Sequence, residues 1–264
     1  MRTAFLGLYT VLGSSLLGPL PLHAQEPGHG LIAVFAHPDD ERIVGPLLAR
    51  YAREGHDVHL VIATDGRLGV REHAGVPAGD SLAHVRAEEA RCAARQLGID
   101  PPIMVGLEDA GLASFTSLER LRRELRRVFR DLRPEVVISF GPEGGTGHPD
   151  HRLVGVVVSE VVQTGGDGIP AALYYASLPA ERMSTAPPAR PEVTSIPGKY
   201  LSAVVPFTPQ DFEAGRRAFA CHRTQYTPEE MDAIMRYLEH GFGGAVHLRP
   251  WHGGAERRTS LFDQ

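Results

Sequence analysis

Two short motifs in the sequence place histidines next to carboxylates. HPDD covers residues 37–40 and is followed by Glu41, and HPDH covers residues 148–151. Carboxylates that gather at the rim of a buried core repel one another unless a positive charge lies among them. Because imidazole nitrogens and carboxylate oxygens are ligands that Zn²⁺ accepts, the two motifs together indicate a divalent-metal site.

The positions of the two motifs support this interpretation. Each follows an apolar segment typical of a strand, residues 31–35 for the first and 135–140 for the second. In each, proline occupies the expected first position of a helix, where its missing N–H costs nothing, so a helix start alone explains either motif. Turns that follow strands flanking the switch point of a doubly wound sheet converge on one crevice, and the pair therefore favours a shared site.

The spacing within the motifs suggests a division of roles. His37 and Asp40 can bind one ion from a helix start, and a third ligand from His148 or His151 would leave a coordination position for water. Asp39 could accept a proton from that water, and the histidine that does not bind the ion could protonate a leaving group or stabilise an oxyanion. These roles predict a metal-dependent hydrolase that cleaves amides.

The elements that must position these residues alternate along the chain. Apolar runs predict strands at 31–35, 58–64, 102–106 and 135–140, and helical spacing predicts helices at 42–54, 81–97, 117–134 and 150–163. The alternation predicts βαβ units in a Rossmann-like, three-layer α/β fold, with a mostly parallel sheet and helices on both faces. Beyond residue 165 we expect a smaller irregular part, with strands at 172–177 and 201–207, helices at 209–221 and 228–240, and a Gly-rich tail.

The N-terminus has the pattern of a secretory signal peptide. A charged Arg2, an apolar stretch and a small-residue site after Ala24 predict cleavage there, which assigns residues 1–24 to the signal and 25–264 to a single domain. Glycine and proline within the apolar stretch argue against a permanent membrane anchor, although an uncleaved anchor is the alternative. We therefore expect a secreted or periplasmic protein.

Composition narrows the function classes further. The formal net charge is −5, which does not favour nucleic-acid binding. Six arginines between residues 120 and 130 alternate with acidic residues and predict a solvated helix face. Cys92 and Cys221 lie in helical contexts, and we expect two buried free thiols, with one disulfide as the alternative. The sequence does not indicate an oligomeric state.

The two motifs carry a resemblance to a known family. AHPDDE (36–41) and GPEGGTGHPDHR (141–152) resemble the LmbE/PIG-L family of zinc-dependent N-acetylglucosaminyl deacetylases, and the resemblance extends loosely over residues 31–225. It implies a Zn²⁺ cofactor, with Fe²⁺ as the alternative. The roles that it implies are zinc ligation by His37, Asp40 and His151, general-base action by Asp39, and acid/base or oxyanion assistance by His148, steered by Asp150.

Weaker correspondences implicate more residues. The resemblance implies that Arg86 holds the substrate, with Glu89 as its partner, and that Asp109 contacts sugar hydroxyls. Some members carry a mobile tyrosine where this sequence has Thr146, and that departure puts assistance by a tyrosine in doubt.

Two further residues are candidates for supporting roles. His222 lies in a CHRTQ segment (221–225) that is similar to a late family element, and this makes it a candidate for supporting the site. Glu41 is expected either to support a metal ligand or to cap the helix that follows.

Three rival functions fit the sequence less well. The glycines of GPEGGTG (141–147) do not have the G-x-G-x-x-G spacing of a dinucleotide site. A two-His-one-carboxylate iron oxygenase conflicts with the βα alternation, and a non-catalytic carbohydrate-binding relative would not need Asp39. We therefore predict a secreted deacetylase that acts on a small-molecule or oligosaccharide amino sugar, with another N-acyl substrate as the alternative.

Overall fold

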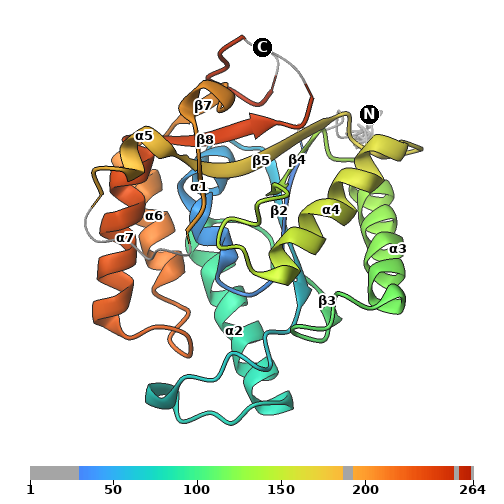
Figure 1. Cartoon of the computed structure of the whole chain (residues 1–264), viewed down its shortest axis with the longest axis vertical. Coiled ribbons are helices and arrows are strands. Elements are labelled where there is room, and N and C mark those ends of the chain that lie inside the picture. Colours follow the sequence, from blue (N-terminus) through green and yellow to red (C-terminus); the bar gives the residue numbers. More distant parts are fainter. Residues whose placement is uncertain (1–29, 187–192, 253–255, 263–264) are drawn as a thin grey trace, which may run out of the picture.

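A mixed sheet with the order β3-β2-β1-β4-β5-β8-β7 forms the centre of the computed structural model, which describes residues 30–186, 193–252 and 256–262 (Figure 1). The predicted signal peptide, residues 1–24, lies outside the described residues. The parallel strands are β1 (Gly30–Phe35), β2 (Asp57–Thr64), β3 (Ile103–Leu107), β4 (Val136–Phe140) and β5 (Ala172–Pro179). β8 (Ala245–Pro250) runs antiparallel between β5 and β7 (Ala203–Pro206), and the short β6 (Ser195–Ile196) pairs with β5.

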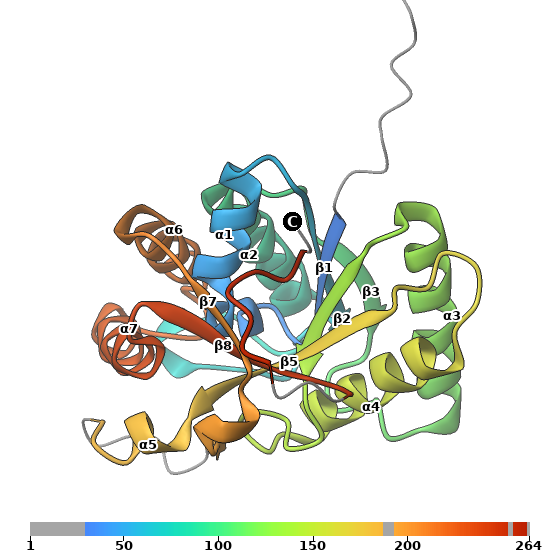
Figure 2. The ribbon, with the colours of Figure 1, turned by 90° about the horizontal axis from the view of Figure 1, so that it is seen from above.

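Helices cover both faces of the sheet, as Figure 2 shows from above. One face carries α3 (Phe115–Leu132) and α4 (Pro149–Thr164). The other carries α1 (Gly45–Arg53), α2 (Asp80–Leu97), α6 (Pro209–Phe219) and α7 (Pro228–Phe242). Short helical turns complete the structure: η1 (Asp40–Ile43), η2 (Glu72–Ala74), α5 (Ala180–Met183) and η3 (Gly198–Tyr200). The predicted Rossmann-like α/β class is confirmed, and no helix in the described ranges combines the length and apolar character needed to cross a bilayer.

Strand β1 shows why its sequence is apolar throughout. All six of its residues are buried, because helices cover both sides of a parallel strand at the centre of a sheet. Leu31, Ala33 and Phe35 contribute to the cluster under α1 and α2. Ile32 and Val34 contribute to the cluster under α3 and α4. The first motif therefore emerges from a strand that is fixed from both faces.

The long amphipathic helix α3 agrees with the sequence. Leu121, Leu125, Val128 and Phe129 are buried, whereas the six arginines are half-buried or exposed. Several of them pair with carboxylates, such as Arg122 with Glu160 of α4. The predicted solvated face is confirmed.

The C-terminal part is more regular than the sequence suggested. Residues expected to be a Gly-rich tail form β8, in which Val246 and Leu248 are buried. His247 is half-buried on this strand, with its Nε2 atom 3.0 Å from the carbonyl oxygen of Phe242. The neighbouring glycines obscure a short alternating strand that becomes evident only beside β5 and β7.

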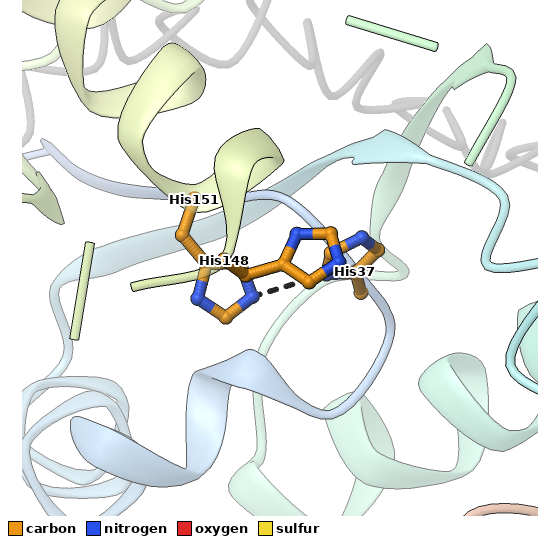
Figure 3. Close-up of side chains that lie close together, drawn as sticks. All are labelled: His37, His148 and His151. Atoms are coloured by element: carbon orange, nitrogen blue, oxygen red, sulfur yellow. Dashed lines mark hydrogen bonds between the residues drawn. The ribbon is translucent and has the colours of Figure 1, made fainter. Parts of the chain in front are cut away.

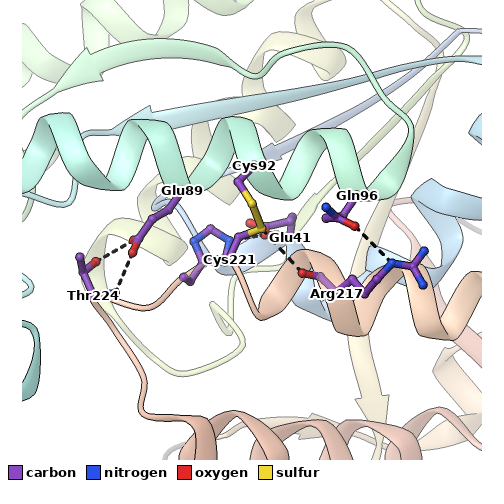
Figure 4. The surroundings of a disulfide bond; sticks show 8 residues. Glu41, Glu89, Cys92, Gln96, Arg217, Cys221 and Thr224 are labelled. Atoms are coloured by element: carbon purple, nitrogen blue, oxygen red, sulfur yellow. Dashed lines mark hydrogen bonds and ion pairs between the residues drawn. A yellow bond between two sulfur atoms is a disulfide. The ribbon is translucent and has the colours of Figure 1, made fainter.

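Cys92 and Cys221 form a disulfide, shown in Figure 4, with their Cα atoms 5.9 Å apart. The expectation of two free thiols is therefore wrong. Cys92 lies on α2 and Cys221 lies just beyond the end of α6, and these two helices pack against each other. The pairing spans 129 residues of sequence, so only the packing of the two helices identifies the partners.

Replacing both cysteines, as in Cys92→Ser/Cys221→Ser, is expected to lower the free energy of unfolding by about 2 to 4 kcal/mol, because the cross-link restricts the unfolded chain. Urea unfolding followed by circular dichroism measures this loss. A reductant should destabilise the wild-type protein to the same extent and leave the double variant unchanged. Equal stability of oxidised wild type and double variant would contradict the assignment.

Candidate metal centre and active site

The two histidine motifs meet at the carboxyl edge of the sheet. The first follows β1 and the second follows β4, and these strands are neighbours at the point where the strand order reverses. Figure 3 shows the result: His37, His148 and His151 each offer a ring nitrogen within 4.8 Å of the other two. The convergence expected from the sequence is present in the structure.

His37, Asp40 and His151 turn their polar atoms toward one point. Nδ1 of His37 lies 3.1 Å from Nε2 of His151. Nε2 of His151 lies 3.2 Å from Oδ1 of Asp40, and Nδ1 of His37 lies 3.6 Å from Oδ2 of Asp40. Tetrahedral zinc with bonds of about 2.0–2.1 Å places its ligand atoms roughly 3.3 Å apart. The three side chains therefore match the spacing of a tetrahedral metal site.

The outer nitrogens of the two rings fix which atoms face that point. Nε2 of His37 lies 3.1 Å from Oδ1 of Asp109, and Nδ1 of His151 lies 2.9 Å from the carbonyl oxygen of Gly144. Only a protonated nitrogen suits such acceptors, so in the neutral form of each ring the facing nitrogen carries a lone pair. Two lone pairs 3.1 Å apart in a buried site repel each other unless a proton or a metal ion lies between them. The donor set therefore fits a metal ion.

His148 has a different environment. It is the N-cap of α4, and its Nδ1 accepts a hydrogen bond from the backbone N–H of Asp150 at 3.2 Å. Burial lowers the pKa of His148, and the nearby His37 and His151 lower it further, so the neutral ring carries its proton on Nε2. The spacing of the motif left the third ligand open between two histidines. This geometry favours His151 as the ligand and makes His148 a hydrogen-bond donor.

Carboxylates outnumber cations in the cluster. Burial opposes protonation of His37, but Asp109, Asp150 and Asp40 outweigh it and hold the pKa of that ring well above its usual value. Burial also opposes ionisation of Asp40, yet His151 and His37 keep its pKa well below the usual range. For Asp109 the contact with His37 overcomes burial and lowers the pKa to about 2. The ionised carboxylates thus attract positive charge, either the proton on His37 or a metal ion that replaces it.

Asp39 lies beside the three facing side chains and is bound from several directions. Its Oδ1 lies 3.3 Å from the guanidinium Nη2 of Arg86, and its Oδ2 lies 3.3 Å from Nη1 of Arg42. The hydroxyl of Tyr226 donates to the same Oδ2. Its backbone has a φ of 113°, in a region that non-glycine residues rarely occupy and that costs about 1–3 kcal/mol. Placing this carboxylate therefore costs folding free energy.

The structure gives Arg86 other contacts than the expected pair with Glu89. Arg86 is 3% exposed and donates to the carbonyl oxygens of Pro38 at 2.6 Å and Gly66 at 2.9 Å. Glu89 instead accepts from the backbone N–H and the hydroxyl of Thr224, both at 2.7 Å. The predicted pairing is wrong because both side chains have closer partners on other segments. Arg86 borders the cavity, but its donors hold the HPDD turn.

Asp109 and Asp150 support His37. Asp109, expected at sugar hydroxyls, contacts His37 through Oδ1 and accepts the N–H of Leu68 through Oδ2 at 3.1 Å. Asp150 was expected to steer His148. Its carboxylate instead accepts the N–H of Ala110 at 2.8 Å and lies 3.5 Å from Nε2 of His37. Carboxylates behind a ligating imidazole orient the ring and raise its basicity.

Glu41 and His222 form a buried pair beneath the HPDD turn. Nε2 of His222 lies 2.6 Å from Oε1 of Glu41, and the two residues are 0% and 1% exposed. The other carboxylate oxygen accepts the backbone N–H of Asp39 at 3.1 Å. Burial lowers the pKa of His222, but Glu41 outweighs it and the pKa is raised. Glu41 thus connects Asp39 to a residue from the C-terminal part.

Residues 221–226 form a segment that contacts residues around the HPDD turn. The disulfide holds Cys221, and Thr224 donates to Glu89 (Figure 4). Gln225 donates to the carbonyl oxygen of Gly69 at 2.8 Å. Tyr226 ends the segment at Asp39. Sequence reasoning missed Tyr226, although it follows directly after the CHRTQ element that drew attention to His222.

A cavity of about 520 Å³ opens onto the cluster. His37, Asp39, Asp40, His148 and His151 border it. Side chains from β5 and α7 also line it. This volume lies within the usual range of roughly 300–1,000 Å³ for small-molecule sites.

Comparison with known sequences identifies relatives of this chain. The sequence model of the PIG-L family, described as GlcNAc-PI de-N-acetylase, matches residues 32–162. A protein of Rhodococcus opacus named 1D-myo-inositol 2-acetamido-2-deoxy-alpha-D-glucopyranoside deacetylase is 31% identical over 239 residues, which cover 75% of this chain and 82% of that protein. A protein of the same name from Rhodococcus jostii is 32% identical with the same coverage.

Solved structures share the fold at lower identity. The N,N'-diacetylchitobiose deacetylase of Pyrococcus horikoshii superposes with a TM-score of 0.66 and 21% identity, covering 84% of each chain. GalB, a 4-carboxy-2-hydroxymuconate hydratase from Pseudomonas putida, superposes with a TM-score of 0.58 and 19% identity, covering 85% of this chain and 97% of that one. Likeness at this level concerns the fold, which is found in enzymes with different reactions.

Gly66 provides a test of how tightly Arg86 is held. A Cβ atom at Gly66 would lie 2.2 Å from Nη1 of Arg86, and φ at this position is +65°. Gly66→Ala is expected to cost about 2–4 kcal/mol of folding stability, from backbone strain plus lost Arg86 contacts. Gly55→Ala is the matched control, since Gly55 also has a positive φ of 88° but has nothing within 4 Å of such an atom. Equal losses in urea unfolding would show that Arg86 moves aside freely.

Proposed function

The chain belongs to the PIG-L family of de-N-acetylases, and from this premise we propose that it is a metal-dependent hydrolase that removes the acetyl group from an N-acetylated amino sugar. The observation that carries the proposal is the set of facing atoms of His37, Asp40 and His151, with Asp39 and His148 beside it at one cavity. The reaction adds water across the amide: the C–N bond breaks, the water oxygen bonds to the acyl carbon, and a proton passes to the nitrogen.

The proposed cofactor is Zn²⁺, held by His37, Asp40 and His151, with Fe²⁺ as the alternative metal. Neutral imidazoles and a carboxylate are suitable ligands for both. When bound, such an ion lowers the pKa of water to about 7 and polarises a carbonyl group.

Asp39 is proposed as the general base that takes the proton of the attacking water. Arg86, Arg42 and Tyr226 contact its carboxylate, so its oxygens are fixed before substrate arrives, which lowers the entropy cost of the reaction.

His148 is proposed to act on the reacting amide as a hydrogen-bond donor. Its Nδ1 is occupied by the N–H of Asp150, so the ring can offer only Nε2–H to the cavity. That donor can stabilise the developing oxyanion, and the proton that Asp39 takes from water can pass to the leaving nitrogen.

The proposed substrate class is an N-acetylglucosamine-type sugar, supported by the names of the Rhodococcus and Pyrococcus relatives. The alternatives are another N-acyl substrate and a carbohydrate that is bound without being hydrolysed. A direct assay separates these alternatives, because the fold itself accommodates more than one reaction.

We propose further that the protein is exported, with a signal peptide cleaved after Ala24. The disulfide between Cys92 and Cys221 supports export, because disulfides persist mainly in oxidising compartments. Substrates outside the cytoplasm, such as cell-wall or glycolipid amino sugars, follow from this location. N-terminal sequencing of the secreted protein should start at Gln25, and an intact N-terminus in the cytoplasm would contradict export.

Acetate release from N-acetylglucosamine-containing substrates tests the reaction. We expect turnover to stop when a chelator removes the metal and to return with added Zn²⁺. Asp39→Asn should lower kcat by about 10²–10⁴-fold, the usual contribution of a positioned base. Asp131→Asn, a matched change at an exposed position of α3, should leave the rate unchanged. Full activity after chelation or in Asp39→Asn would contradict the mechanism, and sugar binding without turnover would support the non-catalytic alternative.

A further inference from the structure

The cavity lining includes apolar side chains from several segments, which we name the apolar annex: Phe140, Leu178, Val193, Ile234, Tyr237 and Leu238. All six belong to one hydrophobic cluster or pack against it. The residues from α7 follow helical spacing, since positions 230, 233, 234, 237 and 238 all line the cavity. One face of this helix therefore forms a continuous side of the cavity.

The annex begins directly at a proposed metal ligand. The ring of Phe140 stacks on the ring of His151, with centroids 4.3 Å apart and planes 7° from parallel. Phe140 also lines the cavity, as does Ile43, which lies three residues beyond Asp40. Apolar surface is therefore available next to the reacting centre.

The cavity also has polar lining, including Glu230 on the same face of α7. Arg86, Asp109 and Gln225 border the cavity together with the metal cluster. Sugar hydroxyls that entered the annex would lose their hydrogen bonds to water without gaining partners, which costs free energy for each group. Methylene groups in the same place would gain about 0.8 kcal/mol each. The annex therefore suits hydrocarbon, and the polar lining suits the sugar.

The helix that forms the annex lies outside the residues that define the family. The family match ends at residue 162, whereas α7 covers Pro228–Phe242. The substrate preference that α7 confers consequently belongs to the C-terminal part of this chain.

We infer that the annex binds a linear N-acyl chain longer than acetyl, so that the preferred substrate is an N-acylated amino sugar with a hydrocarbon tail. This inference rests on the proposed amide hydrolysis. The acyl chain is bonded to the carbonyl carbon that must lie at the metal cluster, so its first methylene groups lie where Phe140 and Ile43 line the cavity. A hydrocarbon attached through the glycosidic oxygen would begin a whole sugar ring away.

A series of N-acyl glucosamines, from acetyl to octanoyl, tests the inference. Because 0.8 kcal/mol corresponds to about fourfold, kcat/KM should rise about fourfold per added methylene until the annex is filled. The octyl glycoside of N-acetylglucosamine is the comparison for the other attachment point and should gain little over the methyl glycoside. A rate independent of acyl length, or a gain seen only with the octyl glycoside, would overturn the inference.

Substitution on α7 identifies the surface responsible. Ile234→Asn places an amide in the annex and should remove most of the gain in kcat/KM from chain length. Arg236→Asn, on an exposed part of the same helix, is the matched control and should keep the full gain. An unchanged chain-length dependence in Ile234→Asn would show that the chain binds elsewhere.

Calorimetry on the zinc-loaded Asp39→Asn protein separates the inference from the proposed reaction. N-octanoylglucosamine, below its critical micelle concentration, should bind more tightly than N-acetylglucosamine, and Ile234→Asn in the same background should abolish the difference. Chain-dependent binding with no hydrolysis of any N-acyl sugar by the wild type would contradict the proposed function but support the annex. Hydrolysis with no dependence on chain length in rates or binding would support the function and reject the inference.

Discussion

The site depends on one electrostatic constraint: two imidazole lone pairs and a carboxylate face one another in a buried place. The facing nitrogens of His37 and His151 are 3.1 Å apart, a distance that is favourable only with a proton or a metal ion between them. Hydrogen-bonding groups behind the two rings hold this arrangement in place. Asp109 lies against the outer nitrogen of His37, and the carbonyl of Gly144 accepts from that of His151. The sheet places the two motifs together, but these outer contacts decide which atoms can bind a cation.

The C-terminal part contributes to the same constraint from the opposite direction. Residues 221–226 bind Glu41, Glu89 and Asp39, and the disulfide attaches their first residue to α2. Asp39 adopts a φ of 113°, a conformation that persists only where neighbouring contacts over-determine it. The late segment therefore does for the proposed base what Asp109 and Asp150 do for the ligand His37. Both the carboxylate of Asp39 and the ring of His37 are held by groups that are distant in sequence.

Local chemistry and strand alternation made the centre of the fold and the convergence of HPDD with HPDH predictable. The choice between His148 and His151 was not readable from spacing, and only the family resemblance selected His151. The structure supplies an independent reason, because His148 caps α4 and its Nδ1 accepts the backbone N–H of Asp150. Tyr226, the disulfide and the contacts of Arg86 were beyond prediction, since each depends on which segments lie side by side. Strand β8 was missed because its pattern is short and its neighbours are glycines.

Substrate choice in this fold must come from parts other than the metal centre. A hydratase and several deacetylases share the architecture, so the fold does not by itself determine which bond reacts. In this chain, one face of α7 lines the cavity together with Phe140 and Leu178. Phe140 belongs to both parts, since it stacks on His151 and lines the annex. Binding energy from a hydrocarbon tail would therefore act beside the reacting carbonyl, where it can hold the amide against the base.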